Sequence, residues 1–299
     1  MKAFFVGRHR RNSELVLIIL SGVVTTGAYV LAAVGRLSSI PANVLPFLIV
    51  VLGLFFAAHV ATRFLAPEAD GLLLPLAGLL NGLGYVFIAR LNDELAAQQA
   101  VWTFLGVGLY CLTLLIVRRS HDLEQFRYIL LLFGLLLLVL PLMPVIGQTI
   151  NGSRIWVRVG PVNFQPGEFA KLALAIFFAS YLVDKRELFR AGTWRVGPLR
   201  LPEPKHVAPV LLAWGVSLLV MISQKDLGTS LLFFMLFLLM LWVSTERLAY
   251  LLTGMVLFMV GAYIAWTQFD HVQTRVDAWL KPWDDPLGSG YQVIEAQFG

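Results

Sequence analysis

Cysteine and charge are both scarce in this chain. Its 299 residues include one cysteine, Cys111, and only 14% are charged. A single cysteine in an apolar run excludes a disulfide framework and a cysteine-based metal site. A soluble domain carries about 25% charged residues, so the composition, with 58% hydrophobic residues, predicts an integral membrane protein. No metal-ligand spacing links the five histidines, and we expect each at an interface or in a loop: His9, His59, His121, His206 and His271.

Long apolar runs recur along the chain. A helix that crosses the hydrocarbon core needs about 20 apolar residues. Lipid offers the backbone no hydrogen-bond partner, and the runs do not alternate as strands would, so each span is predicted to be a helix. The predicted fold class is therefore all-α, a polytopic transmembrane bundle. Nine candidate spans lie at roughly 15–35, 43–62, 71–90, 98–117, 128–146, 168–183, 207–223, 227–243 and 248–267.

The basic residues predict how the spans are oriented. The first apolar run is long and lacks a small-residue cleavage site, so it is read as a retained helix and not as a signal peptide. With the N-terminus in the cytoplasm, 15 of the 23 Lys and Arg residues fall on the inner side and 8 on the outer side. The positive-inside rule favours this orientation. The bias is strongest in the basic loop 184–206. The net charge of +5 thus reports topology and attraction to anionic lipid, and does not indicate nucleic acid binding.

In this orientation three polar segments face outward: 147–167, 224–226 and 268–299. In the first, Pro166 is placed to start a helix, and Glu168 lies in its first turn, where the helix dipole favours a negative charge. Lys171 shares the face of Glu168. Charges inside a span are costly and usually face a cavity or a partner. Two interpretations stay open: a local ion pair that anchors the helix, or a polar lining for an anionic substrate.

The second segment is the short connection Gln224-Lys-Asp-Leu-Gly-Thr229 between two apolar runs. Asp226 opens the following helix and is a candidate N-cap, with Gly228 easing a tight turn. Lys225 beside it is a candidate partner for Glu168 or for a phosphate group. The residues alone favour neither the cap nor a functional site.

The third segment is acidic and rich in turn residues. Asp284 and Asp285 stand between Trp279 and Trp283 on one side and Gly288-Ser-Gly290 on the other. Tryptophan suits the membrane interface, and glycine lets the backbone approach a ligand closely. Without a catalytic role, this stretch is an ordinary Asp-Pro turn. The spacing favours a site where a carboxylate does acid–base work on a membrane-borne substrate.

Taken in this order, the motifs resemble those of the RodA/FtsW/SpoVE family, the SEDS proteins of cell shape and division. The resemblance runs from about residue 71 to the end, which gives a family core at 71–299 and two additional N-terminal helices at 1–70. Such helices are similar to those of the longer RodA-type members of actinobacteria.

The family continues beyond position 299, so we expect this chain to be the N-terminal part of a longer protein, ending after the large outer loop. Family members usually have serine at the position of Gly167 and proline at that of Lys225. The matching motifs are Asn151-Gly-Ser-Arg-Ile-Trp156, Gln165-Pro-Gly-Glu-Phe-Ala-Lys-Leu172, Gln224-Lys-Asp-Leu-Gly-Thr229 and Asp285-Pro-Leu-Gly-Ser-Gly-Tyr-Gln292.

The resemblance implies a peptidoglycan glycosyltransferase that polymerises lipid II at the cell membrane for elongation, cell shape and division. Asp285 matches the family's catalytic aspartate and is the predicted general base. Cations near the leaving pyrophosphate would stabilise its charge, and the candidates are Arg154, Lys171 and Arg275. Glu168 and Asp226 are expected to organise the cavity. Gln165, Gly288 and Tyr291, from the matching motifs, complete the predicted substrate-binding residues.

The resemblance also suggests a cofactor and a partner. A divalent cation, Mg²⁺ or Mn²⁺, is a candidate at the pyrophosphate, although the sequence itself shows no metal site. The expected partner is a class B penicillin-binding protein, a transpeptidase. Two alternatives remain: a lipid II flippase, and a structural subunit that only recruits the transpeptidase. Asp285 distinguishes a polymerase from both alternatives, because only a polymerase requires its carboxylate.

Overall fold

A computed structural model describes residues 2–37, 44–117, 119–150, 152–160, 162–191, 194–196, 199–201 and 204–298. The chain divides into two compact units, residues 1–122 and 123–299. Among the described residues, eight helices are long and apolar enough to cross a membrane, and a further apolar stretch, Ile49–Leu65, is shorter. The helical fold class is confirmed, and the nine predicted spans correspond to these eight helices and the shorter one.

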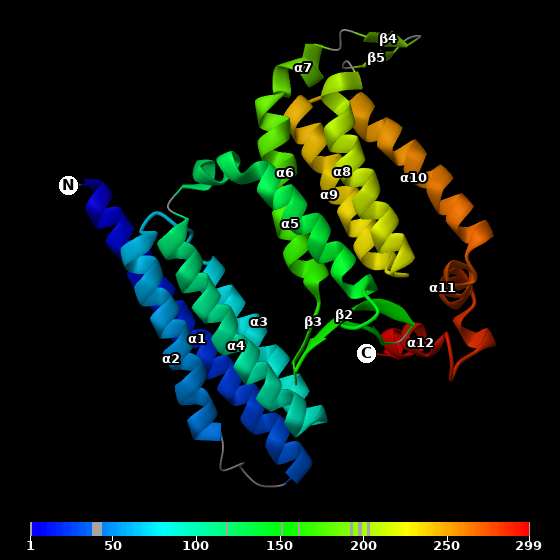
Figure 1. Cartoon of the computed structure of the whole chain (residues 1–299). Coiled ribbons are helices and arrows are strands. Elements are labelled where there is room, and N and C mark those ends of the chain that lie inside the picture. The colour runs from blue at the N-terminus through cyan, green and yellow to red at the C-terminus, as the bar shows by residue number, and fades with distance from the viewer. Residues whose placement is uncertain are drawn as a thin grey trace. The chain divides into compact units, whose positions relative to one another are not determined.

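The first unit consists of four helices, drawn in blue to cyan in Figure 1: α1 (Lys2–Leu37), α2 (Val44–Leu65), α3 (Leu73–Leu91) and α4 (Asp93–Ile116). Helix α1 packs against both α2 and α3, and α4 packs against the same two helices. Gly82 of α3 permits one of these approaches, because a Cβ there would lie only 2.2 Å from Oγ1 of Thr25 on α1. Small residues at such crossings are typical of helices that associate in lipid.

A cluster of buried charged side chains joins the first two helices. Glu14 of α1 is fully buried, and its carboxylate pairs with the guanidinium of Arg11 and, at 2.7 Å, with Nδ1 of His59 on α2. Arg11 also donates to the backbone carbonyls of Pro67, at 3.3 Å, and Ala69 in the turn that precedes α3. The expectation that His59 lies at an interface or in a loop is therefore wrong. Its ring is buried because a carboxylate on the neighbouring helix supplies a hydrogen-bond partner.

The second unit contains the remaining spans. The elements that lead into and form this bundle are η1 (Ser120–Phe126), α5 (Arg127–Val139), η2 (Leu140–Leu142), α6 (Pro166–Asp184), α7 (Arg186–Ala191), α8 (Pro204–Ser223), α9 (Leu227–Thr245) and α10 (Leu248–Gln268). Phe177 and Phe178 of α6 lie at its centre, and Phe178 packs against Phe233 and Phe237 of α9 with ring centroids 5.8 and 5.1 Å apart. Helix α5 packs on α6, and α9 contacts α6, α8 and α10.

Two small antiparallel sheets lie outside the spans and were not predicted. One has the order β1-β2-β3, formed by Gly147–Ile150, Ser153–Val159 and Val162–Phe164; the other pairs β4 (Trp194–Val196) with β5 (Leu199–Leu201). The turn expected at Asn151-Gly152 joins β1 to β2. Gly152 has φ +81°, a left-handed conformation that favours glycine, while Asn151 falls outside the described residues. The predicted span 128–146 is shorter as an α-helix than expected, because η2 and β1 follow it.

The segment after α10 is helical. It consists of α11 (Asp270–Leu280), η3 (Pro282–Asp284) and α12 (Tyr291–Phe298). Within the second unit, this segment and the β1–β3 sheet lie at one end of the helices, while α7 and β4–β5 lie at the other (Figure 1). The acidic turn and the basic loop are thus at opposite ends of the bundle.

Candidate functional site

Two of the three polar segments are held together by hydrogen bonds. The backbone N–H of Arg154 on β2 donates to the carbonyl of Gln224 at 3.1 Å, and the hydroxyl of Ser153 donates to the carbonyl of Lys225 at 3.2 Å. The side chain of Gln224 is 4% exposed and donates to the carbonyl of Leu138 at 2.5 Å. The β1–β3 sheet is therefore bonded to the α8–α9 turn, and that turn is bonded to the end of α5.

The side chain of Arg154 is already engaged by the backbone. Its Nε donates to the carbonyl of Pro141 at 3.0 Å, and a terminal nitrogen donates to that of Met143 at 3.2 Å. Both carbonyls belong to the η2 turn. The guanidinium thus ties the sheet to that turn, which favours a structural contribution. The predicted contact with pyrophosphate stays a prediction.

The start of α6 follows the expected pattern. The helix begins at Pro166 after Gln165, with Glu168 in its first turn. Lys171 donates to Oε1 of Glu168 at 2.8 Å, and its side chain is 18% exposed against 56% for Glu168. The ion-pair partner of Glu168 is thus Lys171, which lies about one turn along the same helix. The alternative in which Lys225 is the partner is wrong.

Asp226 acts as the N-cap of α9. Its Oδ1 accepts a hydrogen bond from the backbone N–H of Thr229 at 3.0 Å. Such a bond satisfies one of the N–H groups that a helix leaves unpaired at its start. The cap interpretation of Asp226 is confirmed, while its predicted role in organising a substrate cavity is not tested by this bond.

The carboxylate of Asp285 is held by its own turn. Its Oδ2 accepts two hydrogen bonds from Ser289, one from the backbone N–H at 2.8 Å and one from the hydroxyl at 3.1 Å. The backbone bond first, then the hydroxyl bond, holds the pKa of the Asp285 carboxyl below its ordinary value. The group is fully exposed and is therefore ionised at neutral pH. Ser289 had no separate role in the sequence interpretation, because its contact with Asp285 depends on the closed turn.

Two glycines allow that turn to close. A Cβ at Gly288 would lie 2.2 Å from Oδ2 of Asp285, and one at Gly290 would lie 2.0 Å from the carbonyl oxygen of Pro282. The backbone N–H of Gly290 donates to the carbonyl of Asp285 at 3.0 Å. Gly288, predicted as a substrate-binding residue, is thus required by the local geometry of the carboxylate.

The acidic segment is not bonded to the other two. Among the described residues, no hydrogen bond or ion pair joins α11, η3 or α12 to the β1–β3 sheet, to the start of α6 or to the α8–α9 turn. Arg275 on α11 and Tyr291 at the start of α12 are both exposed. The structure thus brings two of the predicted clusters together and leaves Asp285, Arg275, Gly288 and Tyr291 on a separate segment after α10.

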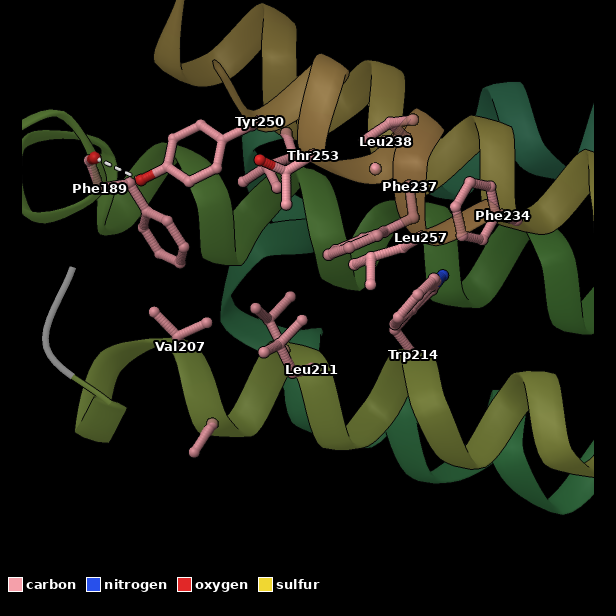
Figure 2. Close-up of a pocket in the computed structure, with 14 residues that line it drawn as sticks. Phe189, Val207, Leu211, Trp214, Phe234, Phe237, Leu238, Tyr250, Thr253 and Leu257 are labelled. Carbon is pink, nitrogen blue, oxygen red and sulfur yellow. Dashed lines mark hydrogen bonds between the residues drawn. The ribbon is translucent and has the colours of Figure 1, made fainter. Parts of the chain in front are cut away.

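A cavity of about 410 Å³ lies elsewhere, among α8, α9 and α10. It contains none of the predicted site residues. Figure 2 shows its aromatic and aliphatic lining, with the hydroxyl of Tyr250 donating to the carbonyl of Phe189 at 3.0 Å. No described residue accepts a hydrogen bond from the indole N–H of Trp214, which is buried there. Few groups in this cavity could do acid–base chemistry, so it is not the candidate active site.

The described residues provide no protein-built metal site. They include no group of three or more His, Cys, Asp or Glu side chains close enough to hold an ion. Asp284 and Asp285 are neighbours, but Oδ2 of Asp285 already accepts two hydrogen bonds from Ser289. These residues do not fit a resident Mg²⁺ or Mn²⁺, so no step below is routed through a metal.

The fold and the motifs together define a polytopic helical membrane protein with an acidic segment after α10. The sequence profile of the FtsW/RodA/SpoVE family, described as "Cell cycle protein", matches residues 72–299. The chain belongs to this family, which confirms the resemblance drawn from the four motifs.

Two curated relatives agree with this assignment. The chain is 38% identical over 300 residues to "Peptidoglycan glycosyltransferase RodA" of Mycobacterium tuberculosis, covering 97% of this chain and 64% of that protein. It is 31% identical over 252 residues to "Probable peptidoglycan glycosyltransferase FtsW" of Nitrosococcus halophilus, covering 81% and 62%. A solved structure described as "Structural coordination of polymerization and crosslinking by a peptidoglycan synthase complex" aligns with 84% of this chain and 63% of that one, at 26% identity and a TM-score of 0.46. The chain thus spans a little under two thirds of these relatives.

Proposed function

We propose that this protein is a peptidoglycan glycosyltransferase that polymerises lipid II into glycan strands on the outer face of the cell membrane. Family membership and the names of its curated relatives support this function. The observation that carries the proposal is the Asp285 carboxylate, which is fixed, exposed and ionised in the segment that follows α10. An ionised carboxylate can accept the proton of a sugar hydroxyl on a lipid-linked substrate.

The reaction requires a base and neutralisation of a leaving group. The 4-hydroxyl oxygen of the acceptor sugar forms a bond to the anomeric carbon of the donor. The bond from that carbon to the lipid pyrophosphate breaks, and the pyrophosphate leaves with the electron pair. Asp285 takes the hydroxyl proton. Lys171 and Arg275 are the proposed cations at the pyrophosphate, while Arg154 supports the sheet through its two carbonyl contacts.

The proposal includes an orientation with the N-terminus in the cytoplasm and two helices, residues 1–70, before the family core. Cysteine labelling tests it, because Cys111 is the one cysteine in this sequence of 299 residues. In a Cys111→Ala background, Leu287→Cys, at a side chain that is 92% exposed, is expected to react with a membrane-impermeant maleimide in intact cells. Glu187→Cys, at an exposed side chain of α7 at the other end of the bundle, is the matched control and is expected to react only after permeabilisation. The reverse pattern would exclude an outward Asp285.

Lys171 provides the comparison with a flippase. A polymerase that uses Lys171 to hold pyrophosphate would lose a hydrogen bond to a charged group, worth about 1.5–3 kcal/mol. Lys171→Met is therefore expected to raise KM for lipid II roughly 10- to 100-fold. Lys281→Met, at an exposed lysine on the same side, is expected to leave KM unchanged. A flippase would instead show lipid II translocation in proteoliposomes that Lys171→Met abolishes and Asp285→Asn leaves intact.

A class B penicillin-binding protein is the proposed partner, on the strength of the family resemblance. A structural subunit that only recruits such a transpeptidase would not need the Asp285 carboxylate. Polymerisation by the purified protein without the partner separates these functions. Strands formed by the protein alone would support the enzyme, and recruitment without any strand formation would support the scaffold.

A further inference from the structure

The two oxygens of the Asp285 carboxylate have different surroundings. Oδ2 accepts both hydrogen bonds from Ser289, at 2.8 and 3.1 Å. No side chain among the described residues donates a hydrogen bond to Oδ1, although the backbone N–H of Gly288 also approaches the carboxylate and helps to lower its pKa. The same residue therefore offers one oxygen that is held in place and one that is open for a hydroxyl group.

The backbone of the turn fixes the position of the whole carboxylate. The carbonyl of Asp285 accepts from the N–H groups of Gly288, at 3.3 Å, and Gly290, at 3.0 Å. Both carboxylate oxygens lie against Gly288, since a Cβ there would lie 2.2 Å from Oδ2 and 2.6 Å from Oδ1. Backbone and side chain of Asp285 are thus both fixed by residues 288–290, and the carboxylate does not rotate without breaking bonds to Ser289.

We propose that Ser289 is the positioning residue for Asp285, holding Oδ2 so that Oδ1 faces the acceptor hydroxyl. This inference rests on the proposed function and adds to it which oxygen takes the proton and what orients it. Orientation of a reacting group can change a rate by about 100-fold for a displacement of about 1 Å. The bonds from Ser289 also favour the ionised form, which keeps the base competent at lower pH.

The test uses two substitutions of Ser289 in the purified protein with lipid II as substrate. Ser289→Ala removes the hydroxyl bond and keeps the backbone bond, while Ser289→Thr retains a hydroxyl. Ser289→Ala is expected to lower kcat roughly 10- to 100-fold with little change in KM. Losing a bond to the charged form raises the pKa of Asp285, so the acid limb of the pH–rate profile is expected to move to higher pH. Ser289→Thr is expected to restore both.

Thr274→Ala is the matched control, because it removes another exposed hydroxyl of the same outer segment, one that donates to the carbonyl of Asp270 at 3.0 Å. It is expected to leave kcat and the acid limb unchanged. The positioning role is overturned if Ser289→Ala keeps the wild-type kcat and acid limb, or if Ser289→Thr is as slow as Ser289→Ala. If Asp285→Asn is inactive in the same assay, these results overturn only the role of Ser289. If Asp285→Asn is active, both that role and the base assignment are wrong.

Discussion

Asp285→Asn is expected to slow glycan-strand formation by at least about 100-fold while leaving the binding of lipid II unchanged. General bases contribute about 10²- to 10⁴-fold to the rates of reactions that need proton removal. Asparagine retains an oxygen that can accept the two bonds from Ser289, so the turn should keep its shape. What the substitution removes is the negative charge and the basic lone pair. The measurement is the initial rate of strand formation together with a lipid II binding curve.

Asp284→Asn is the matched control, because Asp284 is the adjacent acid and the described residues give its carboxylate no hydrogen-bond partner. It is expected to keep a rate within a few fold of wild type. If the two substitutions lowered the rate equally, the total negative charge of the loop would explain its effect on the rate better than a single base would.

The second large effect concerns stability and lies in the N-terminal unit. Glu14→Ala is expected to lower the free energy of unfolding by about 3–5 kcal/mol, the cost of removing one partner from a buried ion pair. Glu14 is fully buried between Arg11 and His59, and its loss would leave the charge of Arg11 without a counter-ion. Unfolding by sodium dodecyl sulfate in mixed micelles, followed by circular dichroism, measures the change.

Glu68→Ala provides the comparison for this effect. Glu68 lies in the turn after α2, is exposed, and makes no ion pair among the described residues. Its removal is expected to change stability by less than about 0.5 kcal/mol. Equal unfolding curves for the two variants would show that the Arg11–Glu14–His59 cluster does not stabilise the unit.

Local rules were enough to predict several features of the fold and site. Proline at the first helical position placed the start of α6 at Pro166, and the N-cap preference placed the start of α9 after Asp226. Apolar length predicted the spans, because lipid requires every backbone group in a span to be bonded internally. These features depend on neighbouring residues, which the sequence shows directly.

Other features depend on contacts between distant residues. The β1–β3 strands are short, and their bonding to Gln224 and Lys225 depends on the packing of α5 and α8. His59 is buried because α1 presents Glu14 to it across 45 residues of sequence. Neither Glu14 nor His59 could be identified as the partner of the other from the residues of its own helix. The contact between Asp285 and Ser289 is local, but it requires the turn geometry that Gly288 and Gly290 permit.

The most direct test of the central claim is incubation of the purified protein with lipid II, followed by separation of the products by size. The proposed function predicts glycan strands that lysozyme degrades, formed by the wild-type protein and not by Asp285→Asn. Wild-type protein that binds lipid II but forms no strands, with or without a class B penicillin-binding protein whose own active site is blocked, would contradict the assignment as a polymerase.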